Sequence, residues 1–172
     1  SEMSTTPKFG FKTFTDQLGS DAISHNTYGV EFVLASALPF YSNLGFVFSH
    51  RTYSTDGYIY GYIYPEYVNS EGQNKSGTPV EVPMQFNDTE FNFGKVIWQA
   101  LPSLKISLGG FISKANRGVY NHYFKYNPYG TPPVRLDDNL GYVKVNYLIN
   151  ERSYLELSVA NYERGFKSSV YD

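Results

Sequence analysis

The chain has 172 residues, a formal net charge of −2 and no cysteine, which excludes a disulfide scaffold, a thiol nucleophile and a cysteine zinc site. A charge so near zero, with no basic block, argues against nucleic acid as the main partner. Aromatic residues make up 18% of the chain and charged residues 17%, a composition that argues against disorder. No apolar run approaches the ~18 residues of a membrane helix, and residues 1–7 lack the apolar core of a signal peptide. We therefore expect one ordered domain or a large piece of a bigger barrel.

Apolar and polar side chains alternate along most of the chain, the period expected of β-strands. In chain order, the predicted strands cover residues 28–38, 44–49, 90–100, 104–108, 141–149 and 155–160. In 141–149, Val143 and Val145 share one face while Lys144 and Asn146 share the other. No segment keeps a helical stripe over three turns, because Gly or Pro interrupts most long stretches. The sequence therefore predicts an all-β protein.

The predicted connections alternate between short and long. Short ones cover 39–43, 102–103 and 150–153, whereas long polar segments cover about 54–88 and 115–138. Segments 28–38 and 139–150 are long enough to cross a bilayer on a tilt, which takes about 9–11 residues. Short turns at one end and long loops at the other are typical of outer-membrane barrels. We predict an antiparallel up-and-down β-barrel of outer-membrane type with about eight strands, or a fragment of a larger barrel, surrounded by outer-membrane lipid.

The same alternation also fits a soluble antiparallel sandwich or a lipocalin-like barrel, in which the apolar face turns inward. Strand parity alone leaves this alternative open. Gly, Ser, Lys, Asn and Glu on the second face suit a wet lumen better than a dry core, which favours the membrane barrel. The deciding side chains are those that the membrane barrel turns toward acyl chains: Val143, Val145, Leu155 and Leu157.

Catalytic chemistry is sparse in this sequence. His25, His50 and His122 form no compact set of metal ligands, and residues 50–54 lack a third group that could orient a base. The carboxylates between positions 66 and 90 are scattered, and no glycine-rich run has the form of a phosphate-binding loop. We predict no enzyme activity, no metal and no cofactor, with a lipid-modifying membrane enzyme as the weakest alternative.

Tyrosines gather in two places. The first set is spaced by two, so that on one strand it would form a single aromatic stripe: Tyr58, Tyr60, Tyr62 and Tyr64. Such a stripe is typical of an interfacial girdle, but it also fits a ligand platform at a barrel mouth or packing in a soluble core. The second set flanks the other long loop and comprises Tyr120, Tyr123 and Tyr126. If both loops open on the same side, the two sets build one aromatic surface for a small-molecule ligand.

Several segments resemble the C-terminal part of the barrel of TonB-dependent outer-membrane receptors. Residues 26–32 (NTYGVEF) are similar to the family's YGVE strand opening, and residues 100–110 (ALPSLKISLGG) to its LPGL periplasmic turn. Residues 140–147 and 155–162 resemble its penultimate hairpin. Residues 161–166 (NYERGF) share only the first residue of the NLFDKxY pattern that usually follows. The likeness extends over most of residues 9–166.

This resemblance implies an outer-membrane receptor for a siderophore-like or other scarce nutrient, bound through aromatic-rich extracellular loops. The family has a plug domain, a TonB box and 22 strands, whereas this chain has room for seven or eight. It is then either a fragment of such a receptor, with a plug and an energy-coupling protein as partners, or a small eight-stranded barrel. Two other functions remain open: a small barrel acting as an adhesin or structural protein, and a soluble barrel or sandwich acting as a binding module.

Overall fold

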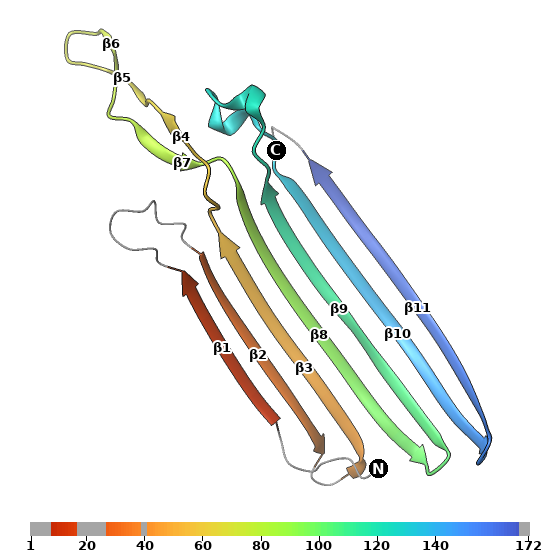
Figure 1. Ribbon diagram of the computed structural model, residues 1–172. Helices are drawn as coiled ribbons and strands as arrows, with labels where there is room; N and C mark the ends of the chain where they lie inside the picture. Colours follow the sequence, from red (N-terminus) through yellow and green to blue (C-terminus); the bar gives the residue numbers. More distant parts are fainter. Residues whose placement is uncertain (1–7, 17–26, 39–40, 169–172) are drawn as a thin grey trace.

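The computed structural model describes residues 8–16, 27–38 and 41–168 (Figure 1). Seven strands form one antiparallel sheet in sequence order, without crossovers. They are β1 (Lys8–Asp16), β2 (Thr27–Leu38), β3 (Tyr41–Thr55), β8 (Phe86–Leu101), β9 (Leu104–Gly118), β10 (Val134–Asn150) and β11 (Ser153–Ser168). The prediction of an all-β, antiparallel, up-and-down fold is confirmed. Among the described residues, no helix is long and apolar enough to span a membrane.

The strands are longer than the sequence pattern indicated. β3 and β9 have 15 residues, β8 and β11 have 16, and β10 has 17, whereas strands in soluble proteins average about 5–6. At about 3.3 Å per residue, β10 is roughly 55 Å long, which exceeds the ~30 Å of a bilayer's hydrocarbon layer. β1 was not among the predicted strands.

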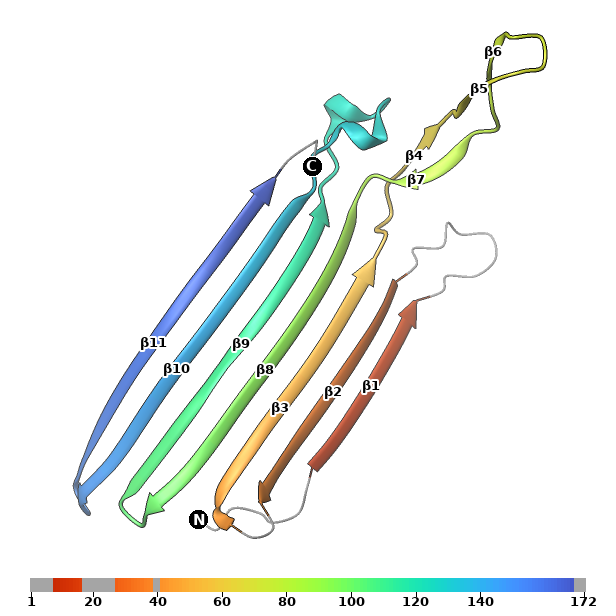
Figure 2. The same ribbon diagram turned by 180° about the vertical axis from the view of Figure 1, so that it is seen from behind.

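Short and long connections lie at opposite ends of the sheet, as predicted (Figures 1 and 2). Residues 102–103 and 151–152 form the short turns. Of the connection predicted at residues 39–43, residues 41–43 belong to β3, and residues 39–40 lie outside the described part of the chain. At the other end, residues 56–85 join β3 to β8 and residues 119–133 join β9 to β10. These loops contain β4 (Tyr60–Ile63), β5 (Glu66–Val68), β6 (Asn74–Ser76), β7 (Val80–Pro83) and the 3-10 turns η1 (His122–Phe124) and η2 (Pro128–Gly130).

The strand register assigns side chains to two faces, because direct partners in an antiparallel sheet point to the same side. Face A carries Phe11 of β1, the odd-numbered residues of β10 and β11, and the even-numbered residues of β2, β3, β8 and β9. Face B carries the residues of the opposite parity on β2, β3, β8, β9, β10 and β11. From Val134 to Lys144, the face A residues of β10 are exposed and the face B residues are half-buried. Face A is therefore the more open side.

Face A bears a continuous apolar band beside the short turns. Along β9 its apolar side chains extend from Leu104 to Ile112, with a gap at Gly110, about 26 Å at 3.3 Å per residue, whereas on β10 and β11 the band covers about 13 Å, from Val143 to Tyr147 and from Leu155 to Val159. Its members are Phe11, Phe32, Leu34, Leu44, Phe46, Phe48, Val96, Trp98, Leu104, Ile106, Leu108, Ile112, Val143, Val145, Tyr147, Leu155, Leu157 and Val159. At the same level, face B carries Lys95, Lys105, Lys144 and Glu156, of which the last two form a 2.7 Å salt bridge.

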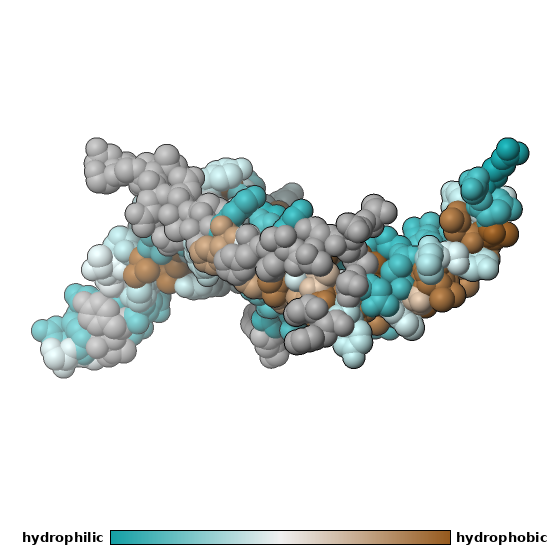
Figure 3. All heavy atoms as spheres, turned by 90° about the horizontal axis from the view of Figure 1, so that it is seen from below, coloured by the Kyte–Doolittle hydropathy of each residue, from teal (hydrophilic) through white to brown (hydrophobic). Residues whose placement is uncertain are grey.

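The band is exposed and covers no protein core. Val143 is 43% exposed, Leu155 58% and Leu157 60%. Among the described residues, the buried apolar side chains are Ala37, Val82, Met84, Ala115 and Pro128, of which only Ala37 and Ala115 belong to the seven-stranded sheet. Viewed from the short-turn end, the molecule is an elongated layer with apolar residues at its surface (Figure 3). A soluble sandwich or a lipocalin-like barrel would bury Val143, Val145, Leu155 and Leu157 in a dry interior. The described sheet does not form such an interior around them.

The sheet is open, with β1 and β11 at its two edges. Because seven antiparallel strands follow one another, β1 and β11 run in the same direction (Figure 1). Direct pairing of the two edges would be parallel, unlike every pairing within the described sheet.

Candidate functional site

The two long loops meet at one end of the sheet. β4 pairs with β7, and Gly61 of this hairpin faces Pro128 of η2, since a Cβ at position 61 would lie 2.8 Å from both Pro128 Cγ and Met84 Sδ. Val82, Met84 and Pro128 are buried there. This small apolar cluster joins the loops, which leave the same end of the sheet (Figure 1).

The first tyrosine set does not form one strand stripe. Only Tyr60 and Tyr62 lie in β4, whereas Tyr58 precedes it and Tyr64 follows it. A turn at Gly57, whose φ is +68°, separates Tyr58 from β3, and Gly57 N donates to Thr55 Oγ1. The tyrosines stand beyond the polar loop end of β3, well away from the apolar band. This position disfavours the interfacial girdle and leaves these side chains in the loops.

A hydrogen bond ties β4 to β7 at its exposed side. Tyr62 Oη donates to Glu81 Oε1 at 2.8 Å. This bond, followed by the charge of Glu81, raises the pKa of Tyr62 above its ordinary value. Burial raises the pKa of Tyr60, and Asp56 and Glu81 add to the effect. Because the folded-state pKa of each phenol is raised, its contribution to stability is present below the unfolded pKa and is lost as pH rises through the folded value.

Replacement of Glu81 should make this pair of phenols ionise at lower pH. In Glu81→Gln the carboxylate charge is lost, so the pKa of Tyr62 falls most and that of Tyr60 falls less. Ultraviolet difference titration of tyrosinate follows both. Glu71→Gln, an exposed carboxylate in the same loop, is the matched control and should leave the curve unchanged. Coincident curves for wild type and Glu81→Gln would contradict the assignment.

The second tyrosine set surrounds η1. Tyr120 Oη lies 3.1 Å from His122 Nδ1, with the two rings edge to face at 6.3 Å. Tyr123 is 95% exposed, and Lys125 Nζ stands 4.6 Å from the centre of the Tyr126 ring. The structure thus places all seven predicted tyrosines at one end of the molecule, although it does not gather them into a single pocket.

A hollow of about 340 Å³ opens where this loop end meets the sheet; we call it the mouth hollow. Tyr58 is the only one of the seven predicted tyrosines that lines the mouth hollow. Its lining on face B consists of Tyr53, Thr55, Asn87 and Arg117, none of which the sequence pattern singled out. The Arg117 side chain is exposed, so a guanidinium, hydroxyls and an amide border one opening. These groups suit an anionic ligand.

Next to the mouth hollow, face B is aromatic. Along β10 the apolar side chains change face near Gly141. Between Gly141 and the short turn they lie on face A, as Val143 and Val145 do, and between Val134 and Gly141 they lie on face B, as Leu136 and Leu140 do. On face B the rings of Phe91 and Phe111 lie 5.4 Å apart, and the Tyr142 ring covers Gly109, where a Cβ would approach Tyr142 Oη to 2.7 Å. An aromatic wall therefore continues from the mouth hollow along face B.

The histidines show no shared site. His50 Nδ1 lies 2.7 Å from Asn92 Oδ1 on face A, His122 contacts Tyr120, and His25 lies outside the described residues. In the part of the chain that the structure describes, no group of three or more His, Asp or Glu side chains is arranged to hold a metal ion.

No protein-family model, curated protein or solved structure matches this chain with significant similarity. The resemblance to TonB-dependent receptors therefore remains a prediction drawn from short sequence segments.

Proposed function

We propose that this sheet is a section of the wall of an outer-membrane β-barrel that acts as a receptor or transport protein for a small nutrient ligand. The observation that carries the proposal is the apolar band. The band is exposed and lies on face A, toward the short-turn end of the strands. Leu34 is aligned with Phe48, Gly94 and Gly110 on the neighbouring strands, and between this level and the short turns no charged residue of the described strands lies on face A. Exposure of so large an apolar patch to water is unfavourable, whereas contact of the same patch with lipid acyl chains is not.

The opposite face suits a water-filled interior. At the level of the band it carries the charged Lys95, Lys105, Lys144 and Glu156, with Val47, Ile97 and Tyr142 as its less polar members. It is thus more polar than face A there, as the lumen side of a membrane barrel is. Trp98 and Tyr147 lie on face A at the short-turn edge of the band, where interfacial aromatics are enriched. Face B would then line the lumen, and the mouth hollow would lie at its outer opening.

The directions of the edge strands fit a wall section. A fully antiparallel barrel has an even number of strands, so closure of this sheet needs an odd number of additional strands. One further strand would make an eight-stranded barrel, and a larger odd number would make a receptor-sized one. The resemblance to TonB-dependent receptors favours the larger barrel.

The ligand end supports a receptor rather than a structural protein. Arg117 and the hydroxyls of the mouth hollow can bind an anion, while the aromatic wall of Phe91, Phe111 and Tyr142 can stack on a flat ligand. An anionic aromatic chelate combines both properties, and siderophore-like ligands of this kind are what the resemblance implies. The loop tyrosines at positions 58, 62, 123 and 126 extend the same aromatic surface toward the solvent.

The receptor function is tested by binding of a ferric tris-catecholate complex to the detergent-solubilised protein. Arg117→Ala should weaken binding about tenfold or more, because a charge-assisted hydrogen bond contributes roughly 1.5–3 kcal/mol. Arg152→Ala removes the same charge from a short turn at the opposite end and should leave the affinity unchanged. Quenching of tyrosine fluorescence by the complex gives the dissociation constants. Equal affinities for wild type and Arg117→Ala, or no binding by wild type, would contradict this site.

A further inference from the structure

The strands of the sheet end at staggered levels on the short-turn side. Through the register, Ala37 of β2 is level with Lys144 of β10, and β2 ends one residue later, at Leu38. The turn between β8 and β9 lies at the level of Tyr147, and β10 ends at Asn150. In Figure 1 the short turns follow one line, and the strands cross this line obliquely.

The stagger gives the inclination of the strands to that line. From the end of β2 to the end of β10 the level shifts by about five residues, or roughly 17 Å at 3.3 Å per residue. The two hairpins are four strand spacings apart, or roughly 19 Å at 4.8 Å per spacing. These lengths correspond to an inclination of about 40°, and strands in closed barrels are tilted by about 35–45°.

The outer edge of the apolar side chains on face A is staggered in the same sense. On β2 they reach Val30, which is half-buried and level with Asp137 of β10. On β11 they end at Val159, which is level with Val143, and Asn161 follows it on the same face. This edge shifts by about six residues, roughly 20 Å, over five strand spacings, roughly 24 Å. The apolar surface therefore has two parallel edges, each inclined by about 40°.

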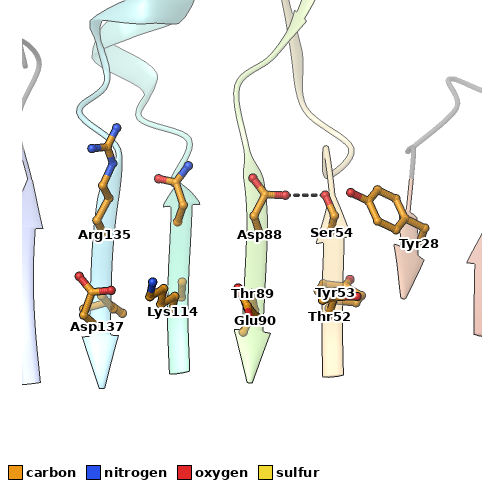
Figure 4. Close-up of a pocket in the computed structure, with 13 residues that line it drawn as sticks. Tyr28, Thr52, Tyr53, Ser54, Asp88, Thr89, Glu90, Lys114, Arg135 and Asp137 are labelled. Atoms are coloured by element: carbon orange, nitrogen blue, oxygen red, sulfur yellow. Dashed lines mark hydrogen bonds between the residues drawn. The ribbon is translucent and has the colours of Figure 1, made fainter. Parts of the chain in front are cut away.

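The level of Val30 is charged on three neighbouring strands. Glu90 of β8, Lys114 of β9 and Asp137 of β10 lie side by side there (Figure 4), and they border a hollow of about 420 Å³. A boundary at right angles to the strands would place either these charges in hydrocarbon or Val30 in water. An oblique boundary avoids both.

The polar pair nearest to this oblique edge is hydrogen-bonded. His50 Nδ1 lies 2.7 Å from Asn92 Oδ1, and Asn92 Nδ2 donates to Glu90 Oε1 at 2.9 Å. Polar groups that leave water are stable where they bond to one another. The pair is therefore compatible with a position at the border of an apolar layer.

We propose that the hydrocarbon layer of the bilayer crosses this sheet obliquely, so that acyl chains contact β2 as far as Val30 and β11 only as far as Val159. The inference rests on the proposed membrane position of face A and specifies which part of each strand contacts lipid. The strands are inclined by about 40° to the bilayer normal. Tyr28, the next face A residue of β2 and an exposed one, then lies at the outer interface, where tyrosine is favoured.

Single cysteines that carry a spin label test this boundary, because the chain contains no cysteine of its own. The variants of the full chain, in phospholipid vesicles, are Val30→Cys, Val159→Cys and Gly165→Cys. Gly165 is level with Val30 through Asp137, and a Cβ there would make only ordinary contacts, the nearest at 3.5 Å. Electron paramagnetic resonance measures collisions of the label with oxygen, which concentrates in hydrocarbon, and with a nickel chelate, which stays in water.

The labels at 30 and 159 should give the same high ratio of oxygen to nickel collisions, and the label at 165 should lose this preference. Ala160→Cys, beside Val159 but on face B, is the matched control and should favour nickel. Polarised infrared spectroscopy of wild type in oriented bilayers should give a strand tilt of about 40°.

Equal nickel preference at 30 and 165, with the label at 159 in hydrocarbon, would overturn the oblique boundary and leave the proposed function intact. Strands parallel to the bilayer normal would do the same. Nickel preference at both 30 and 159 in vesicles would overturn the proposed function itself.

Discussion

A lysine at position 159 should destabilise the protein in lipid bilayers by up to about 2–4 kcal/mol, because a cationic side chain costs this much at the middle of a barrel's lipid face and less toward its edges. Val159 lies on face A, is 65% exposed, and is in direct register with Val143. In Val159→Lys the ammonium group must lose its hydration or distort the bilayer. Unfolding by guanidinium in phospholipid vesicles, followed by the loss of β-sheet circular dichroism, measures the change in free energy of unfolding.

Ala160→Lys is the matched control for Val159→Lys. It places the same charge one residue away on the same strand, but on face B. Exposed positions away from special contacts usually change stability by about 0.5 kcal/mol or less, so this variant should remain close to wild type. Equal effects at 159 and 160 would contradict a lipid-facing band, because water or protein would then surround both faces alike.

The sequence predicted the band end of the sheet better than the loop end. Around Val143 and Leu157, the strict alternation of apolar and polar residues reflects one lipid-compatible face and one polar face, and the predicted strands lie within β10 and β11. On the loop side of Gly141, the apolar side chains Leu140 and Leu136 lie on face B instead of face A. Because the apolar residues are odd-numbered on one side of Gly141 and even-numbered on the other, no single alternation continues through the strand. The sequence pattern therefore did not predict that β10 begins as early as Val134.

The candidate sites depend on register between strands, which local sequence does not reveal. Arg117 and Asn87 lie 30 positions apart, and only the β8–β9 pairing makes them direct partners beside Tyr53. The alignment of Glu90, Lys114 and Asp137 across β8, β9 and β10 likewise follows only from the register of these strands. The tyrosine spacing between 58 and 64 suggested one strand, but pairing with β7 limits β4 to Tyr60–Ile63.

Trp98, the only tryptophan in the chain, should report directly on the surroundings of face A. It is 47% exposed at the short-turn edge of the band. In bilayers that contain brominated phospholipids its fluorescence should be strongly quenched, because bromine atoms on acyl chains reach an indole that lies in the interfacial region. Iodide added to the aqueous phase should quench it weakly.

The matched variant moves the single indole to the other face of the same strand. Trp98→Phe combined with Phe93→Trp exchanges aromatic for aromatic at both positions, and residue 93 lies on face B, opposite Phe111. Its fluorescence should lose the quenching by brominated lipid and gain quenching by iodide, since a lumen-facing ring is reached from water. Both proteins contain one indole on β8. The ratio of quenching by brominated lipid to quenching by iodide can therefore be compared between them without correction for the yield of folding or reconstitution. Quenching of Trp98 by iodide alone would place face A in water and exclude the barrel wall.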